Sequence, residues 1–309
     1  MVKFRRPLYQ KIILLLGFIL AFLFTTTLLT AVHLVRLLWI RLIFHPLLLQ
    51  RKISRKDPGS YQLPYENIIL NTQDGLNLTG WFIPAAKKSG KTVILCHGIT
   101  NSKAFFLPEA AYIVQAGYNL LIFDLRAHGR SEGNFVTFGL KEQIDLEAAI
   151  DYLKKERPAA ARKIGILAHS MGAATTIFVA VRRKELKALV LINCYNNIET
   201  DMAYWVTTLG KLPHWPFVQL GIKSFKKELK VDLKEVSPLQ SVSKIKAPMF
   251  FICSAEDEVT DPKDTHRLYE KAKGQKYYWC IPNAKHETYH QVAGMEFEKK
   301  ILDFYKKAL

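Results

Sequence analysis

The sequence predicts an α/β fold in which a mostly parallel central sheet carries helices on both faces. Short aliphatic and β-branched runs alternate with helix-period segments, a pattern typical of βαβ units. An antiparallel hairpin precedes that alternation, and a long uncharged run near the N-terminus precedes the hairpin. Hydrophobic residues make up 49% of the 309 residues, which is ample for a large core.

The N-terminal run IILLLGFILAFLFTTTLLTAV, residues 12–32, contains no charged residue. As a helix it spans about 30 Å, the thickness of the hydrocarbon core of a bilayer. It predicts an uncleaved, single-pass membrane anchor. A cleaved signal peptide is the alternative, but the run is long and no small-x-small cleavage site follows it. Residues 33–52 are expected either to lie in the membrane interface or to continue the same helix.

The positive charge of the chain is concentrated at its start. Ten of the 44 Lys and Arg residues lie within residues 1–56, which contain no Asp or Glu, and the remaining 34 accompany 27 acidic residues. Such a segment suits anionic headgroups, and because basic residues flank both ends of the anchor, the side of the membrane that holds the rest of the chain stays open. No RNA- or DNA-binding motif is present, so no nucleic acid partner is expected. We divide the chain into an anchor with its juxtamembrane segment (1–56) and one domain (57–309).

The elements of the domain follow from the local patterns. Residues 66–83 predict an antiparallel hairpin that turns at Asp74-Gly75. Strands are expected at 92–96, 118–123, 163–167, 187–193, 248–253 and 275–281. Helices are expected at 105–116, 140–156, 171–184, 262–273 and 294–307. The cysteines lie in apolar runs without metal-type spacing and are expected to be buried free thiols: Cys96, Cys194, Cys253 and Cys280.

Residues 195–243 interrupt the alternation of strands and helices. The segment contains the aromatic residues Tyr195, Tyr204, Trp205, Trp215, Phe217 and Phe225. It predicts a short helical cap or lid over an apolar pocket. Ordinary connecting helices with buried aromatic side chains are the alternative.

Ser170 is the first candidate for chemistry, because ligand sites of parallel sheets lie beyond the carboxyl ends of the strands. In KIGILAHSMGAATT it lies where a strand gives way to a helix, with the small residues Ala168 and Gly172 two positions to either side. Small neighbours are what a nucleophile on a sharp turn requires. The N–H of Met171 is expected near it, at the positive end of the helix.

The chain resembles the α/β-hydrolase superfamily, and within it membrane-anchored members of the serine-aminopeptidase-like or monoacylglycerol-lipase-like kind. The resemblance covers residues 66–309 and is carried by DGLNLTGWFIP, CHGIT, DLRAHGRSEG, AHSMG and SPLQSVSKIKAPMFFICSAEDEVTDP. In this superfamily the nucleophile lies in Gly-x-Ser-x-Gly. Ala168 replaces the first glycine here, which is a mild departure.

The resemblance implies that Ser170 is the nucleophile, Asp257 the acid and His286 the general base, in the chain order of the superfamily. Asp257 is preferred to its neighbours Glu256 and Glu258, because it matches the pattern of a strand, a short loop, an aspartate and then a proline.

The segment LCHGIT resembles the superfamily's oxyanion segment. It implies that the N–H groups of Ile99 and Met171 hold the oxyanion of a tetrahedral intermediate. His97 and His128 are expected to be structural.

Residues 284–290, AKHETYH, contain His-Glu-x-x-His, by which zinc proteases place two ligands on one helix. A Pro-Asn pair just before His286 indicates a loop or a helix start, and a metal site would leave the serine and the aspartate unexplained. We therefore expect no metal ion and no cofactor. His286 carries the chemistry in this interpretation, while Glu287 and His290 line or support the loop.

The function expected is that of a membrane-anchored serine hydrolase that cleaves acyl esters, with lipid or long-chain substrates favoured by the anchor and the aromatic segment. A peptidase, amidase or thioesterase with the same three residues is the first alternative. A non-catalytic, membrane-tethered binding module is the second. The oligomeric state stays open.

Overall fold

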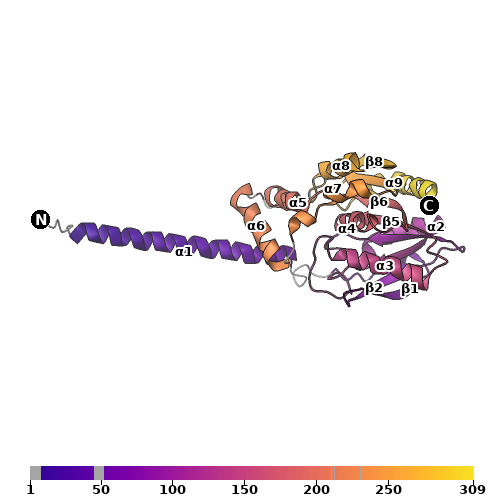
Figure 1. Cartoon of the computed structure of the whole chain (residues 1–309), viewed down its shortest axis with the longest axis horizontal. Helices are drawn as coiled ribbons and strands as arrows, with labels where there is room; N and C mark the ends of the chain where they lie inside the picture. The colour runs from indigo at the N-terminus through magenta and orange to yellow at the C-terminus, as the bar shows by residue number, and fades with distance from the viewer. Residues whose placement is uncertain (1–7, 45–51, 210, 212, 230–231) are drawn as a thin grey trace.

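The computed structural model describes residues 8–44, 52–209, 211, 213–229 and 232–309 (Figure 1). Its described residues form an eight-stranded sheet in the order β1-β2-β4-β3-β5-β6-β7-β8. The strands are β1 (Glu66–Asn71), β2 (Asn77–Ile83), β3 (Lys91–Cys96), β4 (Asn119–Phe123), β5 (Lys163–His169), β6 (Leu186–Ile192), β7 (Met249–Ser254) and β8 (Lys276–Ile281). β2 pairs antiparallel with β1 and with β4, and the remaining neighbours pair in parallel. The predicted fold class is confirmed.

Helices cover both faces of the sheet. Side chains of α3 (Glu142–Glu156), α4 (Met171–Ala180) and α8 (Pro262–Lys271) join one buried cluster, and those of α2 (Leu107–Gln115) and α9 (Tyr289–Ala308) join the other. Successive strand residues alternate between the two clusters, because side chains of a strand point to opposite faces. On β3, for example, Ile94 and Cys96 enter the first cluster while Val93 and Leu95 enter the second.

The antiparallel hairpin turns where the sequence predicts. Gly75 has φ 88°, a conformation that glycine adopts without steric cost. The Thr72 N–H donates to the Leu76 carbonyl at 2.9 Å, and the Leu76 N–H donates to the Thr72 hydroxyl at 2.8 Å. Local hydrogen bonds therefore close the hairpin, and β2 joins it to the rest of the sheet.

Two helix boundaries differ from the predictions by more than two residues. The last helix begins at Tyr289 and not at residue 294, and Gly294, with the non-helical φ 50° and ψ −130°, kinks it at the residue where the sequence predicts its start. α4 ends at Ala180 and not at residue 184, since the N–H groups of Arg182 and Arg183 both turn back to the carbonyl of Val179. The predicted start at residue 294 therefore matches the kink within the last helix and not its first residue.

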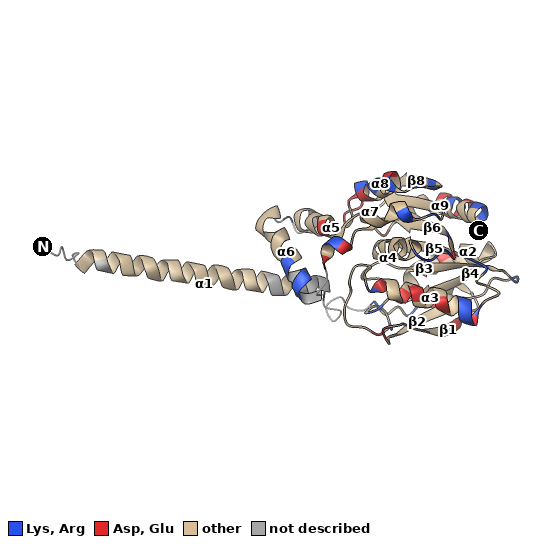
Figure 2. Ribbon diagram, in the orientation of Figure 1, with Lys and Arg blue, Asp and Glu red and all other residues tan. Residues whose placement is uncertain are grey.

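A single helix, α1 (Leu8–Phe44), extends away from the domain (Figure 1). Its stretch Leu8–Val35 is long and apolar enough to cross a membrane, and the 18-residue apolar window within it is not buried inside the structure. In Figure 2 most of the helix is tan, the colour of residues other than Lys, Arg, Asp and Glu, whereas charged residues are spread over the domain. Hydroxyls in the apolar stretch are satisfied within the helix: Thr27 Oγ1 donates to the Leu23 carbonyl at 2.8 Å, and Thr30 Oγ1 to that of Thr26 at 2.7 Å.

Residues 33–44, the first part of the segment 33–52, continue α1. Of the two alternatives for this segment, continuation of the same helix therefore holds for its first part. Residues 45–51 lie outside the described residues.

The segment 195–243 forms α5 (Ile198–Tyr204), a π-helical turn η3 (Trp205–Leu209), α6 (His214–Leu229) and α7 (Pro238–Ser241). Short 3₁₀ turns occur at η1 (Pro58–Tyr61), η2 (Lys103–Phe106), η4 (Leu233–Glu235) and η5 (Val242–Lys244). α6 packs against α1, so this segment lies between the long helix and the domain (Figure 1). Its aromatic residues divide: Tyr195 is buried, Trp215 is 76% exposed, and the side chain of Phe225 is outside the described residues.

Candidate active site

Ser170 occupies the sharp turn between β5 and α4. Its backbone has φ 53° and ψ −120°, which is rare for a residue with a side chain. The Ser170 N–H donates to the carbonyl of Ile192 on β6 at 2.8 Å and so ties the turn to the sheet. Strained backbone persists only where its surroundings hold it, and it clusters at functional sites. The turn thus presents a serine at the carboxyl edge of the parallel strands.

Two glycines allow the backbone to close around this serine. A Cβ on Gly172 would overlap the carbonyl oxygen of Cys96 and would lie 2.6 Å from that of His97. A Cβ on Gly98 would lie 2.9 Å from the Cβ of Ser170. Both positions therefore need glycine for the same reason: the loop after β3 and the start of α4 touch at the serine.

Replacing Gly172 with alanine is expected to destabilise the domain by about 1–3 kcal/mol, because the new methyl meets backbone oxygens that cannot rotate away. The matched control is Gly221→Ala on α6, where a Cβ would meet only the flexible Met202 side chain at 3.7 Å. That change should be neutral or slightly stabilising. Urea unfolding of both variants measures the difference, and a Gly172→Ala protein as stable as the control would contradict this account.

Asp257 and His286 are hydrogen-bonded to each other. Asp257 follows β7, His286 lies in the turn between β8 and α9, and His286 Nδ1 is 2.7 Å from Asp257 Oδ2. Both residues are buried. The other carboxylate oxygen accepts the N–H groups of Val259 and Thr260, each at 2.8 Å. A carboxylate held in this way accepts a hydrogen bond from the Nδ1–H group of His286. The proton of the neutral ring then lies on Nδ1, and the lone pair of Nε2 is available.

Two residues that the sequence analysis did not select hold the backbone of His286. His169 Nε2 donates to the His286 carbonyl at 2.9 Å, and Asn193 Nδ2 donates to the same oxygen at 2.8 Å. Asn193 directly follows β6 and has φ 49°, and its Oδ1 accepts the N–H of Ser254 at 2.8 Å. Because His169 directly precedes Ser170, it connects the turn that carries the serine to the turn that carries the imidazole.

His169 is held in its neutral form. Burial, reinforced by the neighbouring His286, lowers the pKa of His169 well below its ordinary value. Its Nε2 carries the proton, since it faces a carbonyl, and its buried Nδ1 has no partner among the described residues. Those residues likewise include no hydrogen bond from Ser170 Oγ to His286. Such bonds are often long in active sites without a ligand.

The predicted oxyanion donors come from the two segments that flank Ser170. Met171 is the first residue of α4, where backbone N–H groups have no partner within the helix. Ile99 lies in the loop after β3, and its N–H donates to no other group of the described chain. His97 fixes this loop: its Nδ1 donates to the Gly98 carbonyl at 2.7 Å, and its Nε2 accepts the Leu125 N–H at 3.1 Å.

His97 and His128 make the contacts of structural residues. Burial, together with the nearby His128, lowers the pKa of His97 to about 3, so its ring stays neutral. The two rings pack edge to face with centroids 5.1 Å apart. His128 Nδ1 donates to the carbonyl of Arg126 at 2.7 Å.

The two histidines of His-Glu-x-x-His do not share a helix face. α9 begins at Tyr289, so His286 lies in the turn before it and His290 in its first turn. The His290 nitrogens contact other carboxylates, with Nδ1 3.2 Å from Glu109 and Nε2 3.2 Å from Glu298. Across the described ranges no three side chains form a group that could hold a metal ion. The spacing in the sequence here serves two separate histidine–carboxylate contacts.

Two side chains of the segment 195–243 donate hydrogen bonds to the loop that carries Asp257. Tyr204 donates its hydroxyl to the Asp257 carbonyl at 3.0 Å, and Trp205 Nε1 donates to the Val259 carbonyl at 2.6 Å. These bonds give α5 and the π-helical turn a role in positioning the loop that carries Asp257.

Comparison with known proteins places these features in context. The family model described as serine aminopeptidase S33 matches residues 87–238. The uncharacterized protein YqkD of Bacillus subtilis is 28% identical over 245 residues, 79% of this chain and 80% of that protein. An uncharacterized membrane protein of Saccharomyces cerevisiae is 26% identical over 214 residues, 69% of this chain and 70% of that protein. Among solved structures, the Pyrococcus furiosus esterase Pf2001 has a TM-score of 0.70 and 30% identity, covering 84% of this chain and 98% of the esterase.

Proposed function

Because the chain belongs to the α/β-hydrolase superfamily, we propose that it is a serine hydrolase that cleaves carboxylic esters through an acyl-enzyme on Ser170. The observation that carries the proposal is the 2.7 Å hydrogen bond from His286 Nδ1 to Asp257 beside the strained turn at Ser170. A binding module has no need of a buried carboxylate–imidazole pair next to a serine held in this conformation.

In the proposed reaction, Ser170 Oγ attacks the carbonyl carbon of the ester while His286 Nε2 takes the hydroxyl proton. Asp257 stays ionised and stabilises the imidazolium through Nδ1. The tetrahedral intermediate then collapses, and the alcohol leaves with the proton from Nε2. A water molecule, deprotonated by the same nitrogen, attacks the acyl carbon. The bond from that carbon to Ser170 Oγ then breaks, Nε2 returns its proton to Oγ, and the carboxylic acid is released.

The N–H groups of Ile99 and Met171 are the proposed donors to the oxyanion. Losing one such donor costs about 3 kcal/mol of transition-state stabilisation. Their availability in the described chain supports this role, and so does the rigid attachment of the Ile99 loop through His97.

We propose that α1 anchors the enzyme in a membrane as a single-pass helix. The length and apolar composition of Leu8–Val35 support this, as does the similarity to a yeast protein described as a membrane protein. An enzyme held at a bilayer meets lipids at high local concentration, so esters of long-chain acyl groups are the proposed substrates. Amides and thioesters are the alternative substrates that the same three residues could hydrolyse. Amides are included because the matching family model is named for serine aminopeptidases.

A substrate panel on the full chain in detergent micelles tests this proposal. Hydrolysis of p-nitrophenyl octanoate is expected to exceed that of p-nitrophenyl acetate at least tenfold in kcat/KM, since each buried CH₂ contributes about 0.8 kcal/mol. Aminoacyl p-nitroanilides and an octanoyl thioester should be slower than the octanoate. A preparation that cleaves the anilide faster than either ester would identify an amidase or peptidase, and faster cleavage of the thioester a thioesterase.

A further inference from the structure

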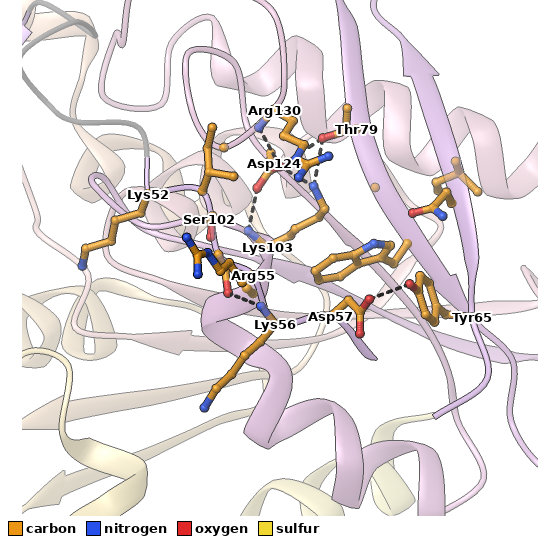
Figure 3. Close-up of a pocket in the computed structure, with 18 of the residues that line it drawn as sticks. Lys52, Arg55, Lys56, Asp57, Tyr65, Thr79, Ser102, Lys103, Asp124 and Arg130 are labelled. Carbon is orange, nitrogen blue, oxygen red and sulfur yellow. Dashed lines mark hydrogen bonds and ion pairs between the residues drawn. The ribbon is translucent and has the colours of Figure 1, made fainter. Parts of the chain in front are cut away.

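A cavity of about 380 Å³ lies between the segment that follows α1 and the first strands of the sheet (Figure 3). This volume is in the range of small-molecule sites. Its walls are residues 52–57, parts of β1 and β2, and the loops after β3 and β4. Ser170, Asp257 and His286 are not among its lining residues, so the cavity is distinct from the candidate active site.

Basic side chains from three segments line this cavity, and those of Lys52 and Lys56 extend outward from it (Figure 3). The basic lining residues are Lys52, Arg55, Lys56, Lys103 and Arg130. Within the described residues, the side chains of Arg55, Lys56 and Arg130 make no hydrogen bond and no ion pair, and Lys52 Nζ reaches only Asn101 Oδ1, at 3.4 Å. Four of the five cations therefore lack a carboxylate partner in the described chain.

The two acidic lining residues are already engaged. Asp57 accepts the Tyr65 hydroxyl at 2.8 Å and the Ser60 N–H at 3.2 Å. Asp124 accepts the Lys103 backbone N–H at 2.7 Å and pairs with Lys103 Nζ at 2.5 Å. Neither carboxylate is placed to neutralise the other four cations, so the cavity keeps an excess of positive charge.

The position of the cavity favours a ligand from the membrane surface. Its basic wall begins at Lys52, eight residues after α1 ends at Phe44. Eight residues reach at most about 29 Å, so the cavity cannot lie far from the end of the long helix. Clusters of Lys and Arg next to a membrane span attract anionic headgroups.

The cavity also borders the loop of the candidate active site. Ser102 lines it, three residues after Ile99. Asn101, between them, donates its amide to Glu287 Oε1 at 2.9 Å, and Glu287 directly follows His286. A ligand in the cavity therefore contacts the loop that contains Ile99. The same loop is hydrogen-bonded, through Asn101, to the residue that follows His286.

We propose that this cavity binds a phosphate-bearing anion, supplied either by the headgroup of an anionic membrane phospholipid or by free phosphate. The planar guanidinium groups of Arg55 and Arg130 can each donate two hydrogen bonds to phosphate oxygens. The hydroxyls of Ser54 and Ser102 line the same space as further donors. The long stems of Lys52 and Lys56 let their ammonium groups supply charge at its rim.

Calorimetric titration of the full-length Ser170→Ala protein in neutral detergent micelles tests the proposal without turnover, and so independently of the hydrolase activity. The probes are inorganic phosphate, dihexanoylphosphatidic acid and zwitterionic dihexanoylphosphatidylcholine. The anions are expected to bind. The double change Arg55→Glu and Arg130→Glu should weaken their binding at least tenfold, since two charge-assisted contacts are lost. Both arginines are exposed and unpaired in the described chain, so folding should survive the change.

The matched control is Lys184→Glu with Lys271→Glu, which introduces the same charge change at exposed positions away from the cavity. It should leave anion binding within about twofold of the parent protein, because distant surface charges are screened. Tighter binding of phosphatidic acid than of phosphate identifies the lipid headgroup as the source, and equal binding identifies free phosphate. Absence of anion binding, equal loss in both double variants, or equal affinity for the zwitterionic lipid would overturn the proposal.

Discussion

Replacing Ser170 with alanine is expected to lower kcat/KM for p-nitrophenyl octanoate by roughly 10⁴-fold or more, because an acyl-enzyme cannot form without the hydroxyl oxygen. The folded state should be unaffected. Ser170 Oγ makes no hydrogen bond in the described chain, and the backbone N–H that ties the turn to Ile192 is kept. Steady-state kinetics gives the first quantity and urea unfolding the second, with stability expected within about 0.5 kcal/mol of wild type.

Ser241→Ala is the control for this change. Ser241 is half-buried at the end of α7 and makes no side-chain hydrogen bond to cap the following turn. Its replacement should leave both activity and stability at wild-type values. Substantial ester hydrolysis by a folded Ser170→Ala protein would mean that the nucleophile is another group.

The second large effect is expected at His286, with His290 as its neighbouring control. His286→Ala should lower kcat/KM by roughly 10⁴-fold or more, since the proposed base is lost while Asp257 keeps its backbone donors. His290→Ala should retain ester hydrolysis, because its nitrogens contact Glu109 and Glu298 and not the serine turn. Comparable loss of activity in both folded variants would contradict these separate roles.

His290→Ala should instead change stability, and in a pH-dependent way. Burial alone would lower the pKa of His290, but the contacts with Glu109 and Glu298 outweigh burial and raise that pKa above its ordinary value. The stabilisation is therefore complete below the unfolded pKa of about 6.5 and is lost as the pH rises through the higher folded pKa. The variant should lose about 1–3 kcal/mol at pH 6, where Glu109 is left buried without its partner, and less at pH 9. Urea unfolding at the two pH values measures this, and an equal loss at both would show that the charge of His290 contributes nothing.

The positions of the strands along the chain could be predicted from the sequence, because a strand buried on both faces is a short apolar run whatever its neighbours are. The runs at β3 and β6, for example, are apolar almost throughout. Helix ends were less accessible. The N-terminus of α9 depends on tertiary contacts of Tyr289 and His290, which local sequence does not encode.

In the candidate site, the side chains that follow strands could be selected because parallel strands bring their carboxyl ends together. The direct bond between Asp257 and His286 agrees with the choice of Asp257 over its acidic neighbours, although the catalytic role of these residues stays a prediction. His169 and Asn193 were missed because their function is to bond a backbone carbonyl, and sequence does not reveal which carbonyl faces which side chain. A polar residue at the end of an otherwise apolar strand was the available signal for both.

Peptide mapping of the full-length protein after reaction with a fluorophosphonate probe tests directly whether Ser170 is the nucleophile. One covalent adduct is expected, on Ser170, that forms as ester hydrolysis is lost, forms much more slowly in His286→Ala and is absent from Ser170→Ala. An actively hydrolysing preparation that stays unlabelled, or that carries its adduct on another residue, would contradict that role of Ser170.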